Sequence, residues 1–91
     1  MSAKYKIAET ESFSRHILKR GFEQVYTKLT AFVYPQLKDN PHFGNNIKKL
    51  KGEYEGIYRY RVGSYRVFYV IDDNSKTIFI LEIQKRKDSY K

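Results

Sequence analysis

The chain contains no cysteine. A disulfide framework and a metal site built from thiolates are therefore both excluded. There are only two histidines, His16 and His42, and they stand far apart in the sequence. Because structural and catalytic zinc sites draw mainly on cysteine and histidine, this composition argues against zinc chemistry. We expect a protein that works without a metal and without any other cofactor.

Long apolar runs are also missing. Seven Lys, Arg and Glu residues fall within the first twenty positions, so no stretch there is apolar enough for a signal peptide or a membrane span. We therefore expect a soluble, cytoplasmic protein that has no membrane as a partner.

Acidic residues are few. Ten Asp and Glu stand against 18 Lys and Arg, which gives a formal net charge of +8, and the isoelectric point is near 9.7. Such an excess of positive charge is typical of a chain that binds a polyanion. It also serves many basic proteins simply as an aid to solubility, so charge alone leaves both interpretations open.

The length favours one domain. Over 91 residues no internal boundary or repeat is visible, so residues 1–91 are predicted to form a single unit. Hydrophobic residues make up 41% of the chain and include nine Tyr and six Phe, enough to bury a core. A domain of this size stays only marginally stable, and a partner protein could therefore matter for its stability.

Alternation and helical spacing predict the order of elements. The expected elements are a strand over 4–10, a helix over 10–20, a helix over 22–40 interrupted near Pro35, a loop over 42–56, and three strands over 54–62, 65–72 and 77–84. This order is β-α-α-β-β-β. It predicts an α+β fold in which two N-terminal helices pack on one face of a small, mostly antiparallel sheet.

The segment YRYRVGSYRV, residues 58–67, indicates a hairpin with a two-residue Gly-Ser turn. In that register Arg61 lies opposite Arg66, and Arg59 shares their face, while the tyrosines of both strands lie on the other face and form core. Paired like charges cost stability, about 0.2–1 kcal/mol for a pair of this kind. A polyanion that draws the three charges together would offset that cost.

A second interpretation treats the three arginines as an ordinary solvated face that Glu53 or Glu55 neutralises. The tail beyond the last strand favours the first interpretation, because it adds cations and a tyrosine near the end of the same sheet. Basic groups with interleaved aromatic rings suit a phosphate backbone with stackable bases. The lysines and the arginine expected to contribute outside the hairpin are Lys48, Lys49, Lys51, Lys85, Arg86 and Lys87, and the tyrosine is Tyr90.

NIKKLKG, followed by YRYRVGSYRVFYVID and closing on KRKDSY, resembles the RelE/ParE superfamily of toxins from toxin–antitoxin pairs. The resemblance covers nearly the whole chain, including the order of its elements. It implies a toxin that a cognate antitoxin protein holds inactive in a hetero-oligomer. In the RelE branch it further implies a ribosome-dependent endoribonuclease that cleaves mRNA without a metal.

Carried over to this chain, the resemblance implies a catalytic group made up of Arg59, Arg61, Arg66, Arg86 and Tyr90. The implied reaction is attack of a ribose 2′-OH on the adjacent phosphorus, which needs a base, cations for the developing charge and an acid. RelE-type enzymes often carry lysines where this chain has Arg59 and Arg61, and some relatives carry histidine at Lys85. Arginine is a poor proton acceptor, so the base is open between Tyr90, Glu53 and Glu55.

The same resemblance leaves two other functions open. A ParE-like chain would poison DNA gyrase through a protein interface on the same fold. A third interpretation is a noncatalytic basic module that binds RNA and leaves it intact. In the ribonuclease interpretation, the residues predicted to bind RNA are Lys48, Lys49, Lys51, Lys85 and Lys87. The arginine and tyrosine of the tail favour the ribonuclease, with the ribosome and mRNA as partners besides the antitoxin.

Overall fold

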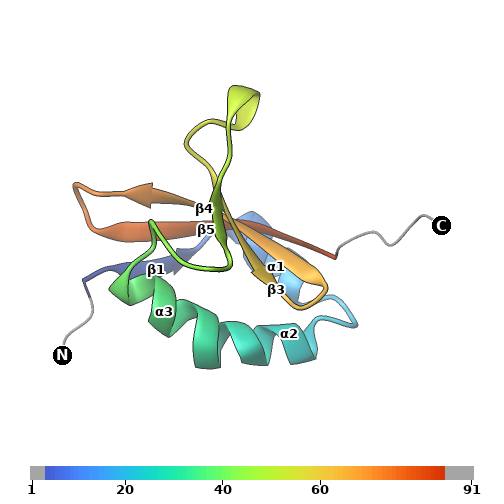
Figure 1. Cartoon of the computed structure of the whole chain (residues 1–91). Coiled ribbons are helices and arrows are strands. Elements are labelled where there is room, and N and C mark those ends of the chain that lie inside the picture. Colours follow the sequence, from blue (N-terminus) through green and yellow to red (C-terminus); the bar gives the residue numbers. More distant parts are fainter. Residues whose placement is uncertain (1–3, 86–91) are drawn as a thin grey trace.

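A five-stranded sheet carries helices on one face in the computed structural model, which describes residues 4–85 (Figure 1). The elements are β1 (Lys6–Glu9), α1 (Glu11–Ile17), α2 (Glu23–Lys28), the π-helical η1 (Leu29–Val33), α3 (Tyr34–Asp39), β2 (Ile47–Lys49), the 3-10 turn η2 (Gly52–Tyr54), β3 (Tyr58–Val62), β4 (Tyr65–Asp72) and β5 (Thr77–Lys85). The strands lie in the order β1-β5-β4-β3-β2, and only the β1–β5 pair is parallel. The predicted α+β fold with a mostly antiparallel sheet is confirmed.

The helix α1 begins at a capping threonine. Oγ1 of Thr10 accepts a hydrogen bond from the backbone N–H of Phe13 at 3.2 Å and donates one to the carbonyl of Ile80 at 2.8 Å. The first bond satisfies one of the free N–H groups at the start of the helix. The second ties that start to β5. Phe13 is fully buried and anchors α1 in the core.

The interruption predicted at Pro35 is confirmed. Three consecutive segments, α2, η1 and α3, form one long helical stretch, and the π-helical part ends just before Tyr34, where α3 begins. Proline has no N–H to donate, so a wide turn before it and a new helical start suit its chemistry. The stretch still presents one apolar face, with Leu29, Val33 and Leu37 buried while Phe32 is 71% exposed.

The loop expected over 42–56 is wrong in part. Residues Ile47–Lys49 form the edge strand β2, which pairs antiparallel with β3. The strand β3 itself begins at Tyr58 rather than at residue 54, because Gly52–Tyr54 form a 3-10 turn. A three-residue strand with two exposed lysines has almost no alternating pattern. Its pairing with β3 therefore comes from tertiary contact and has little local signal.

The core lies between the sheet and the helices. It includes Tyr60 and Tyr69 of the hairpin, which confirms the prediction that the tyrosine face packs inward. The hydroxyl of Tyr69 donates to the carbonyl of Pro41 at 2.8 Å, and that of Tyr60 donates to Oε1 of Gln36 at 2.6 Å. Burial raises the pKa of Tyr69 far above its usual value. Tyr69 therefore fills the core as a neutral phenol, and the hydroxyl groups of both rings have hydrogen-bond partners.

The chain between residues 4 and 85 contains no helix that is long and apolar enough to cross a membrane.

Candidate nucleic-acid interface

The hairpin has the register predicted from its turn. Val62 pairs with Tyr65 and Arg61 with Arg66, around a turn in which Gly63 has φ +59°. A positive φ at this position favours glycine, because other residues meet a steric penalty there. Arg59 pairs with Phe68 on the same face as the other two arginines. The sheet therefore carries three guanidinium groups on the face opposite the helices.

The pairing of four neighbouring strands extends this face into a row. Lys48 of β2 lies opposite Arg59, and Arg59 lies opposite Phe68. Phe68 in turn lies opposite Glu82 of β5, because a bulge in β5 shifts the register between Phe68 and Tyr69. We call this set, Lys48, Arg59, Phe68 and Glu82, the transverse row. Two cations, an aromatic ring and a carboxylate thus lie in line across the sheet.

An open pocket of about 460 Å³ lies on this face. The segment that follows β2 rises above the sheet on the side away from the long helical stretch, as Figure 1 shows. Leu50, Tyr54 and Ile57 of that segment line the pocket. The residues that line it from the sheet are Arg59, Arg66, Phe68, Leu81, Glu82 and Gln84. The pocket combines aromatic and aliphatic surface with two cations, which suits a base attached to a phosphate.

The arginines of the face have few partners. Among residues 4–85 none of the ion pairs includes Arg59, Arg61 or Arg66. The Nε groups of Arg59 and Arg66 are buried and donate no hydrogen bond to the described part of the chain. Burial, together with the charges of Arg66 and Arg61, lowers the pKa of Arg59. Neutralisation by Glu53 or Glu55 is therefore wrong, and the charges stay available to an anion.

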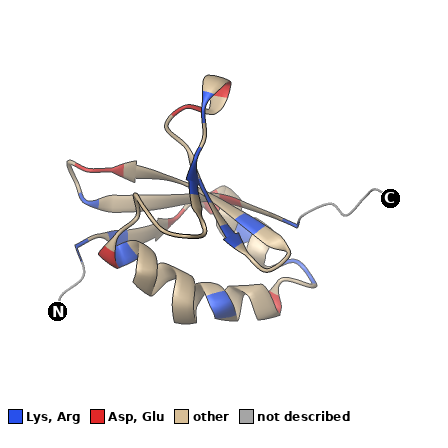
Figure 2. Cartoon of the chain, viewed as in Figure 1, with Lys and Arg blue, Asp and Glu red and all other residues tan. Residues whose placement is uncertain are grey.

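Figure 2 shows basic residues on β2 and on the β3–β4 hairpin, which are neighbours in the sheet. Strand alternation separates the lysines predicted to bind RNA. Lys48 lies on the arginine face, whereas Lys49, opposite Tyr58, and Lys85, opposite Tyr65, lie on the tyrosine face. Lys51 follows the end of β2. The other predicted site residues, Arg86, Lys87 and Tyr90, lie outside the described residues.

A histidine and a carboxylate meet at the edge of the same pocket. Nδ1 of His16 lies 2.6 Å from Oε1 of Glu82, and that oxygen also accepts from the N–H of Ile83 at 3.0 Å. The strand β1 pairs only with the first half of β5, and α1 packs beside the remainder, which brings His16 to Glu82. Sequence reasoning missed this pair because the two residues are 66 positions apart. A carboxylate within a strand pattern was its only local signal.

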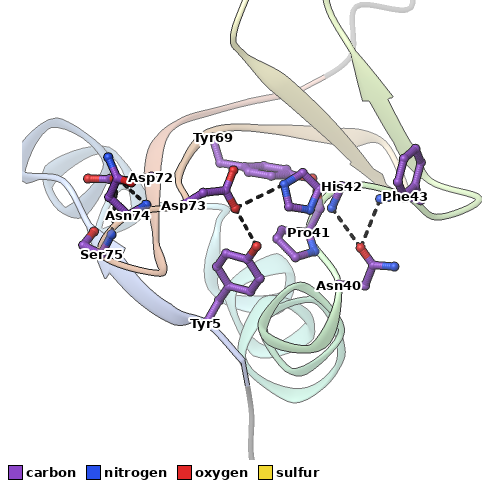
Figure 3. Close-up of polar contacts among 10 residues, drawn as sticks. All are labelled: Tyr5, Asn40, Pro41, His42, Phe43, Tyr69, Asp72, Asp73, Asn74 and Ser75. Carbon is purple, nitrogen blue, oxygen red and sulfur yellow. Dashed lines mark hydrogen bonds and ion pairs between the residues drawn. The ribbon is translucent and has the colours of Figure 1, made fainter.

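A second polar cluster lies where the β4–β5 turn meets the loop after α3 (Figure 3). The hydroxyl of Tyr5 donates to Oδ1 of Asp73 at 2.6 Å, and Nε2 of His42 lies 3.5 Å from the same oxygen. The hydrogen bond from Tyr5, followed by that from His42, lowers the pKa of Asp73, while the same bond raises the pKa of Tyr5. His42 also contacts the rings of Tyr5 and Tyr58 edge-on, so its role is in packing.

This cluster predicts a small acid dependence of stability. A carboxyl whose pKa is lowered by folding contributes stability above its unfolded pKa, near 3.9, and loses it as the pH falls through the folded value. We expect Asp73→Asn to melt slightly below the wild type at pH 6. The difference should shrink steadily as the pH falls below about 4, because Asp73 takes up its proton first in the unfolded state and then, at lower pH, in the folded state. Melting curves from pH 2 to 7 measure it, and a difference unchanged across that range would contradict the assignment.

Comparison with known proteins identifies the family. The family model described as the ParE toxin of type II toxin–antitoxin systems matches residues 8–90. The chain belongs to this toxin family. Toxin RelE of Mycobacterium tuberculosis is 36% identical over 87 residues, which cover 96% of this chain and 87% of that protein. Toxin RelG of the same organism is 41% identical over 44 residues, which cover 48% of this chain and 51% of the relative.

Solved structures agree with this assignment. The toxin–antitoxin complex RelBE2 of M. tuberculosis contains a chain with 28% identity and a TM-score of 0.74, and the match covers 91% of this chain and 99% of that one. The isolated RelE toxin of E. coli matches in fold, with 23% identity, a TM-score of 0.68, and coverage of 93% and 87%. The predicted membership in the RelE/ParE superfamily is confirmed. Within that superfamily this chain is a RelE-like toxin of a toxin–antitoxin system.

Proposed function

We propose that this ParE-family toxin is an mRNA endonuclease that acts on ribosome-bound message in the cytoplasm and so inhibits translation. The observation that carries the proposal is the arginine face. Three guanidinium groups gather there, and among residues 4–85 none has an acidic partner. Two of them keep a buried Nε–H free. Such donors, fixed before the substrate arrives, stabilise charge that develops on a phosphate.

The proposed reaction needs no metal. The ribose 2′ oxygen attacks the adjacent phosphorus, the bond to the 5′ oxygen breaks, and the products are a 2′,3′-cyclic phosphate and a free 5′-OH. Arg59, Arg61 and Arg66 stabilise the extra negative charge on the phosphorane oxygens. Arg86 is proposed to add a further cation. Tyr90 is proposed to stack on a base or to move a proton.

RNA binding outside the reacting phosphate is assigned to lysines. Lys48 extends the transverse row and contacts the same strand of RNA, while Lys49, Lys51, Lys85 and Lys87 supply contacts at other points of the surface. Each phosphate contact of this kind contributes a salt-sensitive part of the affinity that is independent of sequence. The division follows from strand alternation, since Lys48 alone of the lysines in β2 shares a face with the arginines.

The partner proposed for control is a cognate antitoxin protein. Three similar solved structures are named as complexes of a RelE-type toxin with an antitoxin. A net charge of +8 favours an acidic or amphipathic segment in the partner. We propose that the two proteins form a hetero-oligomer in which the toxin is inactive.

A second candidate function has its own support. The matching family model is named for ParE and the parDE system, which favours the poisoning of DNA gyrase. That function would use the arginine face, or another surface, to bind a protein and would leave RNA intact. A noncatalytic RNA-binding module would bind through the same cations and also leave the RNA intact.

One experiment separates the three functions. Purified toxin is added to ribosomes translating a defined message, and the new 5′ ends of the RNA are mapped by primer extension. New ends that appear only on translated message, and that vanish when antitoxin is present, are the expected result. Supercoiling by DNA gyrase is assayed in parallel. Intact message with inhibited gyrase would establish the gyrase poison, and intact message with bound toxin would establish the RNA-binding module.

A further inference from the structure

We propose that Glu82 is the general base of this toxin and that His16 positions it. The inference rests on the proposed ribonuclease function and adds the group that removes the proton from the 2′-OH. Its basis is the convergence in one pocket of a carboxylate, an aromatic ring and two guanidinium groups from three adjacent strands.

The transverse row gives this convergence its geometry. Phe68 lies between Arg59 on one side and Glu82 on the other. Neighbouring strands are about 4.8 Å apart, so the backbones of Arg59 and Glu82 are separated by about 10 Å across the ring. Arg66 is two residues from Phe68 on β4 and lines the same pocket. An RNA nucleobase stacked on the half-buried Phe68 ring would thus place its own sugar and phosphate between the two arginines and the Glu82 carboxylate.

The contacts of Glu82 leave it one free oxygen. Its Oε1 accepts hydrogen bonds from Nδ1 of His16 and from the N–H of Ile83. Its Oε2 takes part in no hydrogen bond within residues 4–85. The side chain retains 36% of its exposure, so that oxygen is open to a substrate. One oxygen holds the group in place and the other can accept a proton.

Other described groups suit the base less well. Guanidinium groups stay protonated, so the three arginines cannot accept the proton. Glu53 and Glu55 were candidates from the sequence, yet neither belongs to the residues that line the pocket. Glu82 is the only carboxylate among the described residues that does. Sequence reasoning passed over it because it stands in the middle of an otherwise regular strand.

Oε2 of Glu82 takes the proton from the 2′-OH as the 2′ oxygen forms its bond to phosphorus. The bond from phosphorus to the 5′ oxygen then breaks, and water protonates the leaving oxygen. The hydroxide so formed recovers the proton from Glu82, which returns the enzyme to its starting state. No oxidation or reduction takes place, and no metal is used.

His16 acts through Glu82. The His16 side chain is 28% exposed, and its ring packs edge-on against the ring of Phe22, with 4.9 Å between the two ring centroids. This packing sets the orientation of the imidazole before the substrate binds. The Nδ1–H bond then holds the carboxylate at the edge of the pocket. A misplaced catalytic group can lower the rate by about 100-fold, so a carboxylate held in position by His16 should support faster cleavage than a mobile one.

The test is Glu82→Gln, which keeps the shape and the acceptor oxygen and removes the basicity. Single-turnover cleavage on translating ribosomes is expected to fall at least about 100-fold, the usual contribution of a general base. Binding to the ribosome should stay within about threefold of the wild type. Glu11→Gln, which neutralises an exposed carboxylate on α1, serves as the matched control and should leave the cleavage rate unchanged.

Two further variants keep the test decisive if Glu82→Gln folds poorly. His16→Asn places an amide N–H near the position of Nδ1 and should cleave within about threefold of the wild type, whereas His16→Ala should lose about 10- to 100-fold. Cleavage by Glu82→Gln at the wild-type rate would overturn the inference while the ribonuclease function stands. Equal loss in both His16 variants would mark the contact as structural and would also overturn it. A wild-type toxin that leaves translated message intact would refute the proposed function itself.

Discussion

Arg66→Ala is expected to lower cleavage of translated mRNA by about 100- to 1,000-fold, the usual cost of removing one fixed donor to a developing oxyanion. Arg66 occupies the centre of the arginine face. It lies opposite Arg61, lines the pocket with Arg59, and keeps a buried Nε–H without a partner in the described chain. Without it, the charge on the phosphorane would lose its central cation.

The same variant should fold at least as well as the wild type. A like-charged pair across two strands is destabilising by about 0.2–1 kcal/mol, and a buried donor without a partner adds to that cost. Removing Arg66 relieves both. We therefore expect the free energy of unfolding to stay level or to rise while activity falls, which is the behaviour of a residue kept for function.

Two controls sharpen this prediction. Arg66→Lys keeps a positive charge but loses the planar pair of donors, so it should recover only part of the activity. Arg15→Ala removes an equal charge from an exposed ion pair with Glu11 and should leave cleavage unchanged. Single-turnover cleavage and urea unfolding supply the two readouts. A melting temperature several degrees lower for Arg66→Ala would show instead that this arginine is structural.

Phe13→Ala is expected to reduce the free energy of unfolding by about 3–5 kcal/mol, the usual cost of deleting a fully buried aromatic ring. Phe13 is 0% exposed and is the one buried residue of α1. Its ring joins the core formed by β5 and the long helical stretch. For a small domain such a loss is a large part of the total stability, which is commonly about 5–15 kcal/mol.

The substitution should also disturb the pocket, because α1 carries His16. Without Phe13, α1 keeps the Thr10 cap, the contact of His16 with Glu82 and the partly buried side chain of Ile17. Urea unfolding followed by circular dichroism measures the effect. Leu18→Ala is the matched control, because Leu18 is 83% exposed at the end of the same helix and should change stability by less than about 0.5 kcal/mol. Equal losses in the two variants would show that α1 does not depend on Phe13 for its anchorage.

Local sequence was sufficient to predict the hairpin and, for most elements, whether they form a helix or a strand. A two-residue turn that begins with glycine sets the register of its two strands, and a period of two then assigns every side chain to a face. For this reason the pairing of Arg61 with Arg66 and the inward face of Tyr60 could both be predicted residue by residue. The helix start, which the sequence left open between Thr10 and Ser12 and which the structure places at Thr10, and the restart near Pro35 likewise depend on backbone hydrogen bonding, which is a local property.

The strand β2 shows where local information ends. Ile47–Lys49 has three residues and no usable alternation, so its own preference for extended structure is weak. It becomes a strand because β3 offers it hydrogen-bonding groups, and only that pairing places Lys48 beside Arg59 and Lys49 on the opposite face. The sequence alone grouped these two lysines, and the sheet separates them.

The sequence by itself determined the family and the net charge, which depend on the order and the composition of the residues along the whole chain. It also determined the hairpin and the face that carries the arginines, because these depend on residues that are near one another in the chain. The tertiary structure alone decided which carboxylate meets that face. A bulge in β5 sets Glu82 opposite Phe68, and the end of β1 leaves room for α1 to bring His16 to it. Contacts across 66 residues depend on how sheet and helix pack together, and no local pattern of side chains specifies them.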